Sequence, residues 1–438
     1  HAESPHGPSP APPTPPTHHS LVPPASSWRL TACALIAFAL VMGLANAGPL
    51  GKVAAQATTK PPSELVEDAI PLTEGSRREI DASEISAYLD PGRSLSIQDI
   101  LARGGDAFGP LPTPRIDLGY TKAQIWLRIP VRNTSDAPID RVIVLHARFM
   151  HHLEGFKVSD RSPAPQLILQ NSASQPFAER ALPYRHIAAP LTLEPGESAV
   201  IYIGYWSDGA SQMPISFETP ASFERLAARA DVFNAAVYAA CFAMIAFTLM
   251  AIAVMRWRVH IAYALYFGWV VLFLAHLEGY TFQFLWPDWP RFNAYGSLSI
   301  GYGLSFFAIL FTREFLKLRN HAPYDDRVGV GLMIGTLLVI GFGAFGDTQF
   351  IKRFGFVFNF GTSVFLIASA IISIRHRQPG AVYYFVGWSA IFLATLLSAV
   401  THWIEDTFAL SMTNNFIAVA VLFEAMIFTL AINAQVRV

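Results

Sequence analysis

The chain has 438 residues, and its 31 Lys and Arg residues almost balance its 32 Asp and Glu residues, which leaves a net charge of −1. This balance gives no electrostatic basis for a nucleic-acid partner. Apolar residues make up 52% of the chain and charged residues 14%, well below the roughly 25% charged residues of average soluble domains. The composition therefore excludes a purely soluble protein of ordinary type.

The N-terminal region is interpreted as three short segments. Residues 1–28 are rich in proline and are predicted to form a disordered tail, because such a composition cannot bury a core. Arg29 precedes an apolar run that ends in small residues at Ala45–Ala47. Residues 29–57 are therefore predicted to be a secretory signal peptide, with an uncleaved signal anchor as the alternative. Residues 58–76 are expected to form a linker.

Residues 77–225 are predicted to form an all-β domain. Short runs of alternating apolar and polar residues are separated by turn residues, and this alternation indicates strands with one buried face. The predicted strands are 123–131, 141–145, 166–169 and 199–203. Such a succession favours a two-sheet sandwich, and a short helix is expected at 94–103. The two cysteines, Cys33 and Cys241, lie outside this domain, so no disulfide is expected in it.

Seven apolar stretches follow one another in residues 230–438. Each is about 18–24 residues long, which is enough for a helix to cross a hydrocarbon core of ~30 Å. The predicted helices are 232–255, 261–278, 294–312, 328–345, 354–374, 381–400 and 415–434. The chain is therefore predicted to be a multidomain protein, in which an all-β sandwich precedes an all-α seven-helix transmembrane bundle.

The loops between these helices differ in charge, and the difference predicts an orientation. Only three basic residues lie in the loops on the side of the sandwich: Arg291, Lys352 and Arg353. The basic residues on the other side are Arg256, Arg258, Arg313, Lys317, Arg319, Arg327, Arg375, Arg377 and Arg437. Since cytoplasmic loops carry an excess of Lys and Arg, the sandwich is predicted to be outside the cytoplasm and the C-terminus inside.

Several motifs of the chain resemble one known family. In the β domain they are Ala87–Pro91, Ser96–Ile100, Leu118–Tyr120, Ile125–Arg128, Val131–Asn133 and Leu193–Glu197. In the bundle they are Gly279–Tyr280, Trp286–Pro287, and Glu424 ahead of Phe428–Ala431. With these motifs, roughly residues 80–438 are similar to the bacterial seven-transmembrane receptors with diverse intracellular signalling modules.

The resemblance implies a receptor with an extracytoplasmic, jelly-roll-like module similar to carbohydrate-binding domains. A small-molecule ligand, such as a carbohydrate or a carboxylate, would bind this module, and the bundle would pass the signal to a cytoplasmic output module. We expect that module, a diguanylate cyclase or a histidine kinase, to lie beyond Val438 or on a separate partner. The chain itself is expected to be non-catalytic and free of cofactors, to form a homodimer, and to reside in the bacterial inner membrane with a periplasmic N-terminal domain.

Candidate ligand-binding residues lie on strand ends and loops, where a sandwich presents its binding groups. Trp126 and Arg128 are two residues apart and so share one strand face. A ring can stack on a sugar while a guanidinium binds hydroxyls or an anion, although Trp126 also fits a purely structural core position. The further candidates are Arg148, Glu179, Arg180, His186, Tyr205 and Trp206. His151 and His152 point to opposite faces of a strand, so no metal site is expected there.

Glu424 is the most informative residue of the predicted bundle, because it lies near the middle of the last apolar stretch. A charge at that depth costs about 2.5–3.5 kcal/mol on insertion scales, so the side chain is expected to face the bundle interior, to be protonated, or to pair with a Tyr, Ser, Asn or His group of a neighbouring helix. It is a candidate signalling switch, or else a hydrogen bond that fixes helix packing. His276, Glu278 and His402, at the outer ends of helices two and six, are further candidates for signal transmission, or interfacial groups that reach water.

Three other seven-helix functions fit less well. A membrane metal hydrolase needs His and Asp at one depth, whereas the histidines of the bundle lie towards both ends. A retinal photoreceptor needs a lysine inside helix seven, and 415–434 contains none. A membrane transporter remains the alternative, although the Gly-rich segment 341–346 lies near a helix end and not at the midplane.

Overall fold

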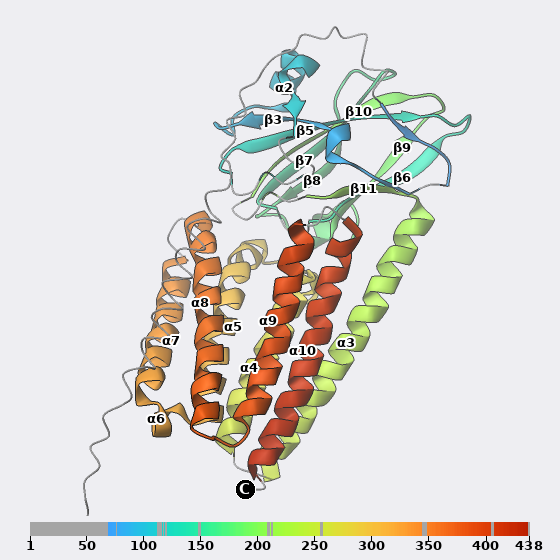
Figure 1. The fold of residues 1–438 in the computed structure, drawn as a ribbon. Coiled ribbons are helices and arrows are strands. Elements are labelled where there is room, and N and C mark those ends of the chain that lie inside the picture. The colour runs from blue at the N-terminus through green and yellow to red at the C-terminus, as the bar shows by residue number, and fades with distance from the viewer. Residues whose placement is uncertain are drawn as a thin grey trace, which may run out of the picture.

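The protein consists of a β-rich head placed at one end of a long helical bundle, as the computed structural model in Figure 1 shows. The structure describes residues 69–436 except for 76, 112–115, 117, 119–120, 148–149, 208–210, 212, 255–256, 344–347 and 404–406. The predicted tail, the predicted signal segment, the linker up to residue 68 and the candidate residue Arg148 lie outside the described residues.

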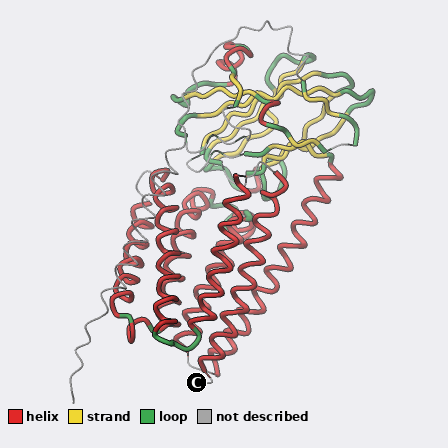
Figure 2. The backbone as a smooth tube through the Cα atoms, viewed as in Figure 1, coloured by secondary structure: helices red, strands yellow, loops and turns green. Residues whose placement is uncertain are grey.

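The head is a sandwich of two sheets (Figure 2). The larger has the strand order β4-β3-β5-β10-β7-β8, and β1 pairs in parallel with β5. Its strands are β1 (Ile70–Leu72), β3 (Ser86–Asp90), β4 (Gly109–Pro110), β5 (Gln124–Asn133), β7 (His152–Ser159), β8 (Gln166–Ser172) and β10 (Ser198–Trp206). The smaller sheet has the order β2-β11-β6-β9. Its strands are β2 (Arg78–Glu79), β6 (Ile139–Leu145), β9 (Ile187–Leu193) and β11 (Ile215–Glu218).

The predicted strands are present as β5, β6, β8 and β10, each within a few residues of its expected bounds. Among the strands that were not predicted, β1 lies inside the segment that the sequence indicated as linker. A strand of three residues is too short to show alternation. Only its parallel pairing with Val131–Asn133 of β5 reveals it.

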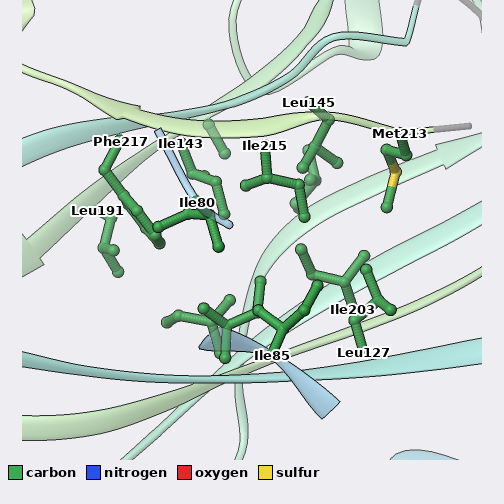
Figure 3. Packing of buried hydrophobic residues seen from close by; sticks show 14 of the residues in the cluster. Ile80, Ile85, Leu127, Ile143, Leu145, Leu191, Ile203, Met213, Ile215 and Phe217 are labelled. Atoms are coloured by element: carbon green, nitrogen blue, oxygen red, sulfur yellow. The ribbon is translucent and has the colours of Figure 1, made fainter. Parts of the chain in front are cut away.

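The main core lies between the two sheets (Figure 3). Leu127 and Ile203 of the larger sheet face Ile143 and Phe217 of the smaller, and each of these side chains is fully buried. The alternation of β5 explains this arrangement, since Ile125, Leu127 and Ile129 all belong to the inter-sheet core. At about 25 cal/mol per Å² of buried apolar surface, this core is the main stabilising element of the head.

A second, smaller core lies on the outer face of the larger sheet. Trp126 points to this face because it alternates with the core residues of β5, and it is 0% exposed. The helix α2 (Ile97–Arg103) covers the ring with Ile100, and a capping box between Ser96 and Asp99 fixes the start of the helix. The short helix expected at 94–103 is therefore confirmed, and it buries Trp126.

Gly204 on β10 is expected to be intolerant of a side chain. A Cβ atom at this position would lie 2.9 Å from the ring of Trp126, which cannot move because α2 covers it. We expect Gly204→Ala to destabilise the head by about 1–3 kcal/mol, measured as a lower thermal unfolding midpoint. Gly109→Ala is the matched control, since nothing lies within 4 Å of its added Cβ; equal midpoints for the two variants would contradict the expectation.

The bundle follows the head directly. Its helices are α3 (Pro220–Val254), α4 (Trp257–Leu277), α5 (Pro290–Leu316), α6 (Leu318–His321), α7 (Pro323–Gly343), α8 (Thr348–Arg375), α9 (Ala381–Trp403) and α10 (Thr407–Val436). Five of them, α3, α4, α5, α7 and α8, are long and apolar enough to cross a membrane. In α9 and α10, the residues whose side chains the structure describes form shorter apolar helical segments, 381–394 and 416–432.

The long helices match the seven predicted stretches, with one informative difference. Helix α3 begins at Pro220, twelve residues before the predicted start at residue 232. Hydropathy marks only the part of a helix that crosses the lipid. Helix α3 begins closer to the head, and its first turns are polar and contain Glu224 and Arg225. The end of α10 lies at the opposite end of the bundle from the head (Figure 1).

Candidate functional site

The head and the bundle meet at a joint built from the loop between β8 and β9. The turn η4 (Phe177–Glu179) of this loop reaches the connection between α4 and α5, which contains the π-helical turn η5 (Thr281–Leu285). The backbone N–H of Phe177 donates to the carbonyl of Pro287 at 2.9 Å. The rings of Phe177 and Phe282 pack edge to face, with centroids 5.6 Å apart. The head is thus bonded to a loop of the bundle far away in sequence.

Arg185 ties the same loop to two helices. Its side chain is 4% exposed, and Nη1 lies 3.0 Å from Oδ1 of Asp231 on α3. The same nitrogen donates to the hydroxyl of Tyr280, just after α4, and that hydroxyl donates to Asp231 Oδ1 at 2.6 Å. Burial alone lowers the pKa of Arg185, but Tyr184, Tyr280, Glu278 and Asp231 raise it above its ordinary value. Arg185 is therefore a permanent cation held by Asp231 of α3 and by Tyr280 in the connection after α4.

The acidity of Tyr280 supports this arrangement. Burial, together with the hydrogen bond to Asp231, raises the pKa of the Tyr280 phenol to about 12. The phenol therefore remains protonated and can donate to the carboxylate at neutral pH.

Arg180 fills the space between the loop and the bundle. Its Nη1 donates to the carbonyls of Tyr184 and Arg185 at 2.9 and 3.0 Å, and its guanidinium carbon lies 4.8 and 5.3 Å from the ring centroids of Phe177 and Phe282. Burial lowers the pKa of Arg180 to about 10, so the group is still charged at neutral pH. A desolvated cation stacked on rings is worth up to ~2 kcal/mol, which makes Arg180 a stabilising part of the joint.

The covalent link between head and bundle is stiffened by Glu218, the last residue of β11. Its carboxylate is 0% exposed. It accepts hydrogen bonds from Arg77 Nε at 2.7 Å and from Ser216 Oγ at 3.0 Å. Ser222, in the first turn of α3, donates to the other carboxylate oxygen at 2.7 Å. These bonds fix the direction in which α3 leaves the sheet.

A polar centre lies deep in the bundle around Glu424. Its side chain is 0% exposed, and Oε1 accepts a 2.8 Å hydrogen bond from the Tyr266 hydroxyl on α4. Its other oxygen, Oε2, has no hydrogen-bond partner among the described residues. An incompletely satisfied acid in a buried site is costly, and such groups inside membrane bundles often mark functional sites.

Aromatic side chains enclose this centre and connect four helices. Tyr266 stacks on Phe311 of α5, with centroids 5.7 Å apart and ring planes within 6° of each other. The Tyr263 hydroxyl donates to the Ala425 carbonyl at 3.1 Å. On the neighbouring helices, the hydroxyls of Tyr384 and Thr312 lie 2.6 Å apart. Glu424 therefore contacts α4 directly through Tyr266, and Tyr266 in turn contacts Phe311 of α5 and Trp388 of α9.

A small cavity lies between the joint and this centre, at the outer ends of α3, α4 and α10. Asn234, Tyr238, Glu278 and Ile417 are among the residues that line it. Its volume is about 20 Å³, which is room for roughly one water molecule. It is too small for an organic ligand, for which pockets of about 300 Å³ or more are usual.

Comparison with protein families decides the identity of both parts. The family model described as "7TMR-DISM extracellular 2" matches residues 82–219, and the model described as "7TM diverse intracellular signalling" matches residues 230–435. The chain belongs to this 7TMR-DISM family. No match was found among curated proteins. Membership confirms the resemblance seen in the sequence, and it establishes a receptor-like membrane protein that has an extracellular N-terminal domain and belongs to a sensory and signalling class.

The predicted ligand-binding residues of the 7TMR-DISM extracellular module are not gathered in one place. Trp126 and Arg128 share a face, as expected, and Arg128 lies beneath the loop after α2, where an added Cβ on Gly105 would be 3.6 Å from Arg128 Nε. Tyr205 is 0% exposed and points into the inter-sheet core. Trp126 and Tyr205 therefore present no ring surface to solvent.

Trp206 is partly exposed, but its ring already has partners. It stacks on His151, with centroids 5.2 Å apart, and the guanidinium carbon of Arg93 lies 4.0 Å from its ring centroid. Nearby on β7, His152 Nε2 lies 3.7 Å from a carboxylate oxygen of Glu154. These side chains form a polar cluster around Trp206, a predicted ligand-binding residue that is partly exposed.

The remaining candidates of the extracellular module belong to the joint. Arg180 is described above; Glu179 is exposed next to it, and the His186 ring packs near Tyr184 and His146, with centroids 5.5 and 5.7 Å apart. The sequence placed these residues correctly on one loop, but it did not indicate that the loop faces the 7TM region.

The candidates for signal transmission divide in a similar way. Glu278 lines the small cavity, whereas His276 bridges the connection after α4, with its ring nitrogens 2.8 Å from the Thr281 and Ser297 hydroxyls. His402 belongs to α9, and its side chain lies outside the described residues. No group of three His, Cys, Asp or Glu residues in the described part of the chain is arranged to hold a metal ion.

Sequence reasoning missed Asp231, Phe177 and Tyr266. Asp231 lies just before an apolar stretch and looks like an ordinary flanking residue, and Tyr266 looks like one more aromatic of a membrane helix. Asp231 and Tyr266 are distinguished only by a buried partner. The partners are Arg185, 46 residues from Asp231, and Glu424, 158 residues from Tyr266.

Proposed function

We propose that this 7TMR-DISM protein binds a small extracytoplasmic molecule, a carbohydrate or a carboxylate, with its extracellular module. The 7TM region then transmits the binding event to a cytoplasmic output module, in cis or in trans, which carries any catalytic activity. The protein works in the inner membrane of a bacterium, as a homodimer, with its C-terminus in the cytoplasm.

The observation that carries this proposal is the bond network of Arg185. A ligand can shift a two-state protein only by binding one state better than the other, so the ligand-binding module must make contacts that differ between states. Arg185 joins the module to α3 and to the end of α4 at one point. A displacement of the β8–β9 loop therefore acts on two helices at once.

The route from the joint to the cytoplasmic side runs along α10. Ile417 of α10 lines the cavity that Asn234 and Glu278 also line, and Glu424 lies two turns further along the same helix. Helix α10 ends at the pole of the bundle opposite the head (Figure 1). A movement of α10 would thus reach an output module attached after Val438.

Charge supports the proposed orientation. Lys317, Arg319, Arg375 and Arg377 lie at the ends of helices that are far from the extracellular module. Cytoplasmic loops carry such an excess of basic residues, so the C-terminus is assigned to the cytoplasm.

The cluster of Arg93, His151 and Trp206 is the part of the module that we assign to the ligand. Arginine binds carboxylates and sugar hydroxyls through its planar set of N–H donors. The Trp206 ring already packs on His151 and Arg93. Recognition of the ligand at this cluster would therefore depend more on hydrogen bonds than on stacking.

The ligand assignment predicts the effect of one substitution. In the full chain in lipid nanodiscs, a panel of sugars and small carboxylates should contain a compound that raises the unfolding midpoint of the extracellular module. Arg93→Ala should weaken its binding about tenfold or more, since a charged hydrogen bond contributes about 1.5–3 kcal/mol. Arg103→Ala is the matched control, because Arg103 also lies over a ring, that of Tyr88, in the same module.

Two results would contradict the proposed function. A reporter that is active only in the cytosol, fused after Val438, would remain silent despite good expression if the orientation were wrong. A ligand that binds the module but leaves the activity of a fused output module unchanged would remove the receptor assignment.

A further inference from the structure

The connection between α4 and α5 exposes an unusual set of large apolar side chains. Phe284, Leu285 and Trp289 are 68%, 61% and 67% exposed, and Phe292, in the first turn of α5, is 44% exposed. These residues lie within nine positions of one another. An exposed apolar surface of this kind marks contact with a protein or a membrane.

The other face of the same connection is occupied by the extracellular module. Thr281 and Phe282 are 0% and 4% exposed, and Phe282 packs against Phe177. The Pro287 carbonyl accepts the hydrogen bond from the Phe177 N–H. The connection is therefore held by the head through Phe282 and Pro287, while Phe284, Leu285 and Trp289 remain exposed.

The position of the connection identifies what covers the apolar side. The two spans that it joins end at Leu277 and begin at Pro290, so the connection lies at the depth where hydrocarbon meets the lipid headgroups. Tryptophan and phenylalanine beside polar residues are typical of segments at that depth. Asp288 and Arg291, both exposed, flank Trp289 as such a segment requires.

We propose that Phe284, Leu285 and Trp289 insert into the headgroup–acyl boundary of the outer leaflet, so that the bilayer itself is a second input to the joint. The lipid surface positions the connection, and the connection positions Phe177 through the hydrogen bond to Pro287. This inference deepens the proposed function, but its tests require neither a ligand nor an output module, so the two can fail separately.

The first test measures the depth of the connection. Spin labels are placed at Phe284→Cys, Leu285→Cys and Trp289→Cys in the full chain reconstituted in phosphatidylcholine–phosphatidylglycerol vesicles, with Cys33 replaced by serine and Cys241, which is 0% exposed, retained. Accessibility to oxygen is compared with accessibility to a water-soluble nickel complex. Leu337→Cys on α7, at a position 56% exposed, is the lipid reference, and Leu167→Cys on β8, at a position 51% exposed, is the water reference.

We expect the three labels to favour oxygen, as the label at Leu337→Cys does. Labels that behave like the one at Leu167→Cys would overturn the proposal, because they would show the connection in water.

The second test measures coupling to the head. Leu285→Asp should draw the connection out of the apolar boundary and weaken the hydrogen bond between Phe177 and Pro287. We expect the Phe177 amide to exchange its hydrogen about tenfold faster, which corresponds to ~1.4 kcal/mol. Leu167→Asp is the control and should leave that rate unchanged. An unchanged rate in Leu285→Asp, or an equal acceleration in both variants, would overturn the coupling.

Discussion

Glu424→Gln is expected to leave insertion and folding intact but to change the resting output of a fused signalling module about fivefold or more, the range of ordinary allosteric coupling. Glutamine has nearly the same shape and can still accept the 2.8 Å hydrogen bond from Tyr266. It cannot gain or lose a proton, however, and its amide brings two donors to the place where Oε2 has no partner among the described residues. The balance between two arrangements of α10 should therefore change.

Tyr266→Phe is the companion variant for this prediction. It removes the donor and leaves the buried acid without its hydrogen bond, which should cost about 1–3 kcal/mol. Thermal unfolding in detergent measures this loss, and the fused reporter measures signalling. If both variants signalled like the original protein, with and without ligand, Glu424 would be a packing residue only.

Arg185→Ala is expected to disconnect the extracellular module from the bundle without unfolding either part. The inter-sheet core does not contain Arg185, so the module should keep its unfolding midpoint. Asp231, whose side chain is 55% exposed, can be solvated when the arginine is absent. We expect the ligand response of the reporter to fall about tenfold, since hydrogen bonds to charged groups contribute about 1.5–3 kcal/mol.

Two further variants make this prediction specific. Asp231→Asn should reproduce much of the loss, and the double variant should be little worse than either single one, because the two side chains act as a pair. Arg161→Ala is the control: this exposed arginine of the head donates to the Pro195 carbonyl at 2.7 Å, away from the joint. A full response in Arg185→Ala would contradict the role of the joint.

The two predictions concern the joint, at Arg185, and the centre of the bundle, at Glu424. A double variant at these positions tests whether the two are connected. The joint acts on α3 and on the end of α4, and Glu424 is bonded to Tyr266 in the same helix α4. A resting signal altered by Glu424→Gln should therefore persist when Arg185 is replaced, because it arises below the joint. Ligand dependence should be lost in the double variant.

The position of Trp126 shows how far a local pattern extends. Alternation along β5 predicted correctly that Trp126 and Arg128 share a face. It could not show that α2 covers this face, because the packing of α2 on the sheet depends on residues about 25 positions away in the chain. A ring that was a candidate ligand platform is for this reason fully buried.

Glu424 illustrates the opposite case. Its isolation in an apolar stretch predicted that it faces the bundle interior, is protonated or pairs, because the cost of exposing a charge to lipid is large compared with most packing terms. The structure shows it buried and hydrogen-bonded to Tyr266. The sequence did not identify Tyr266 as the donor, since the bundle contains many hydroxyl groups at similar depths and only the packing of α4 against α10 selects one.

The sequence alone determined the division into a β-rich head and a helical membrane bundle, and the approximate place of each long element. These features depend on hydropathy and alternation, which act over a few neighbouring residues. Only the tertiary structure decided that the β8–β9 loop contacts the bundle, because Arg185 meets partners 46 and 95 residues away. Such a meeting results from how two sheets and a helix bundle pack together, and no local pattern contains that information.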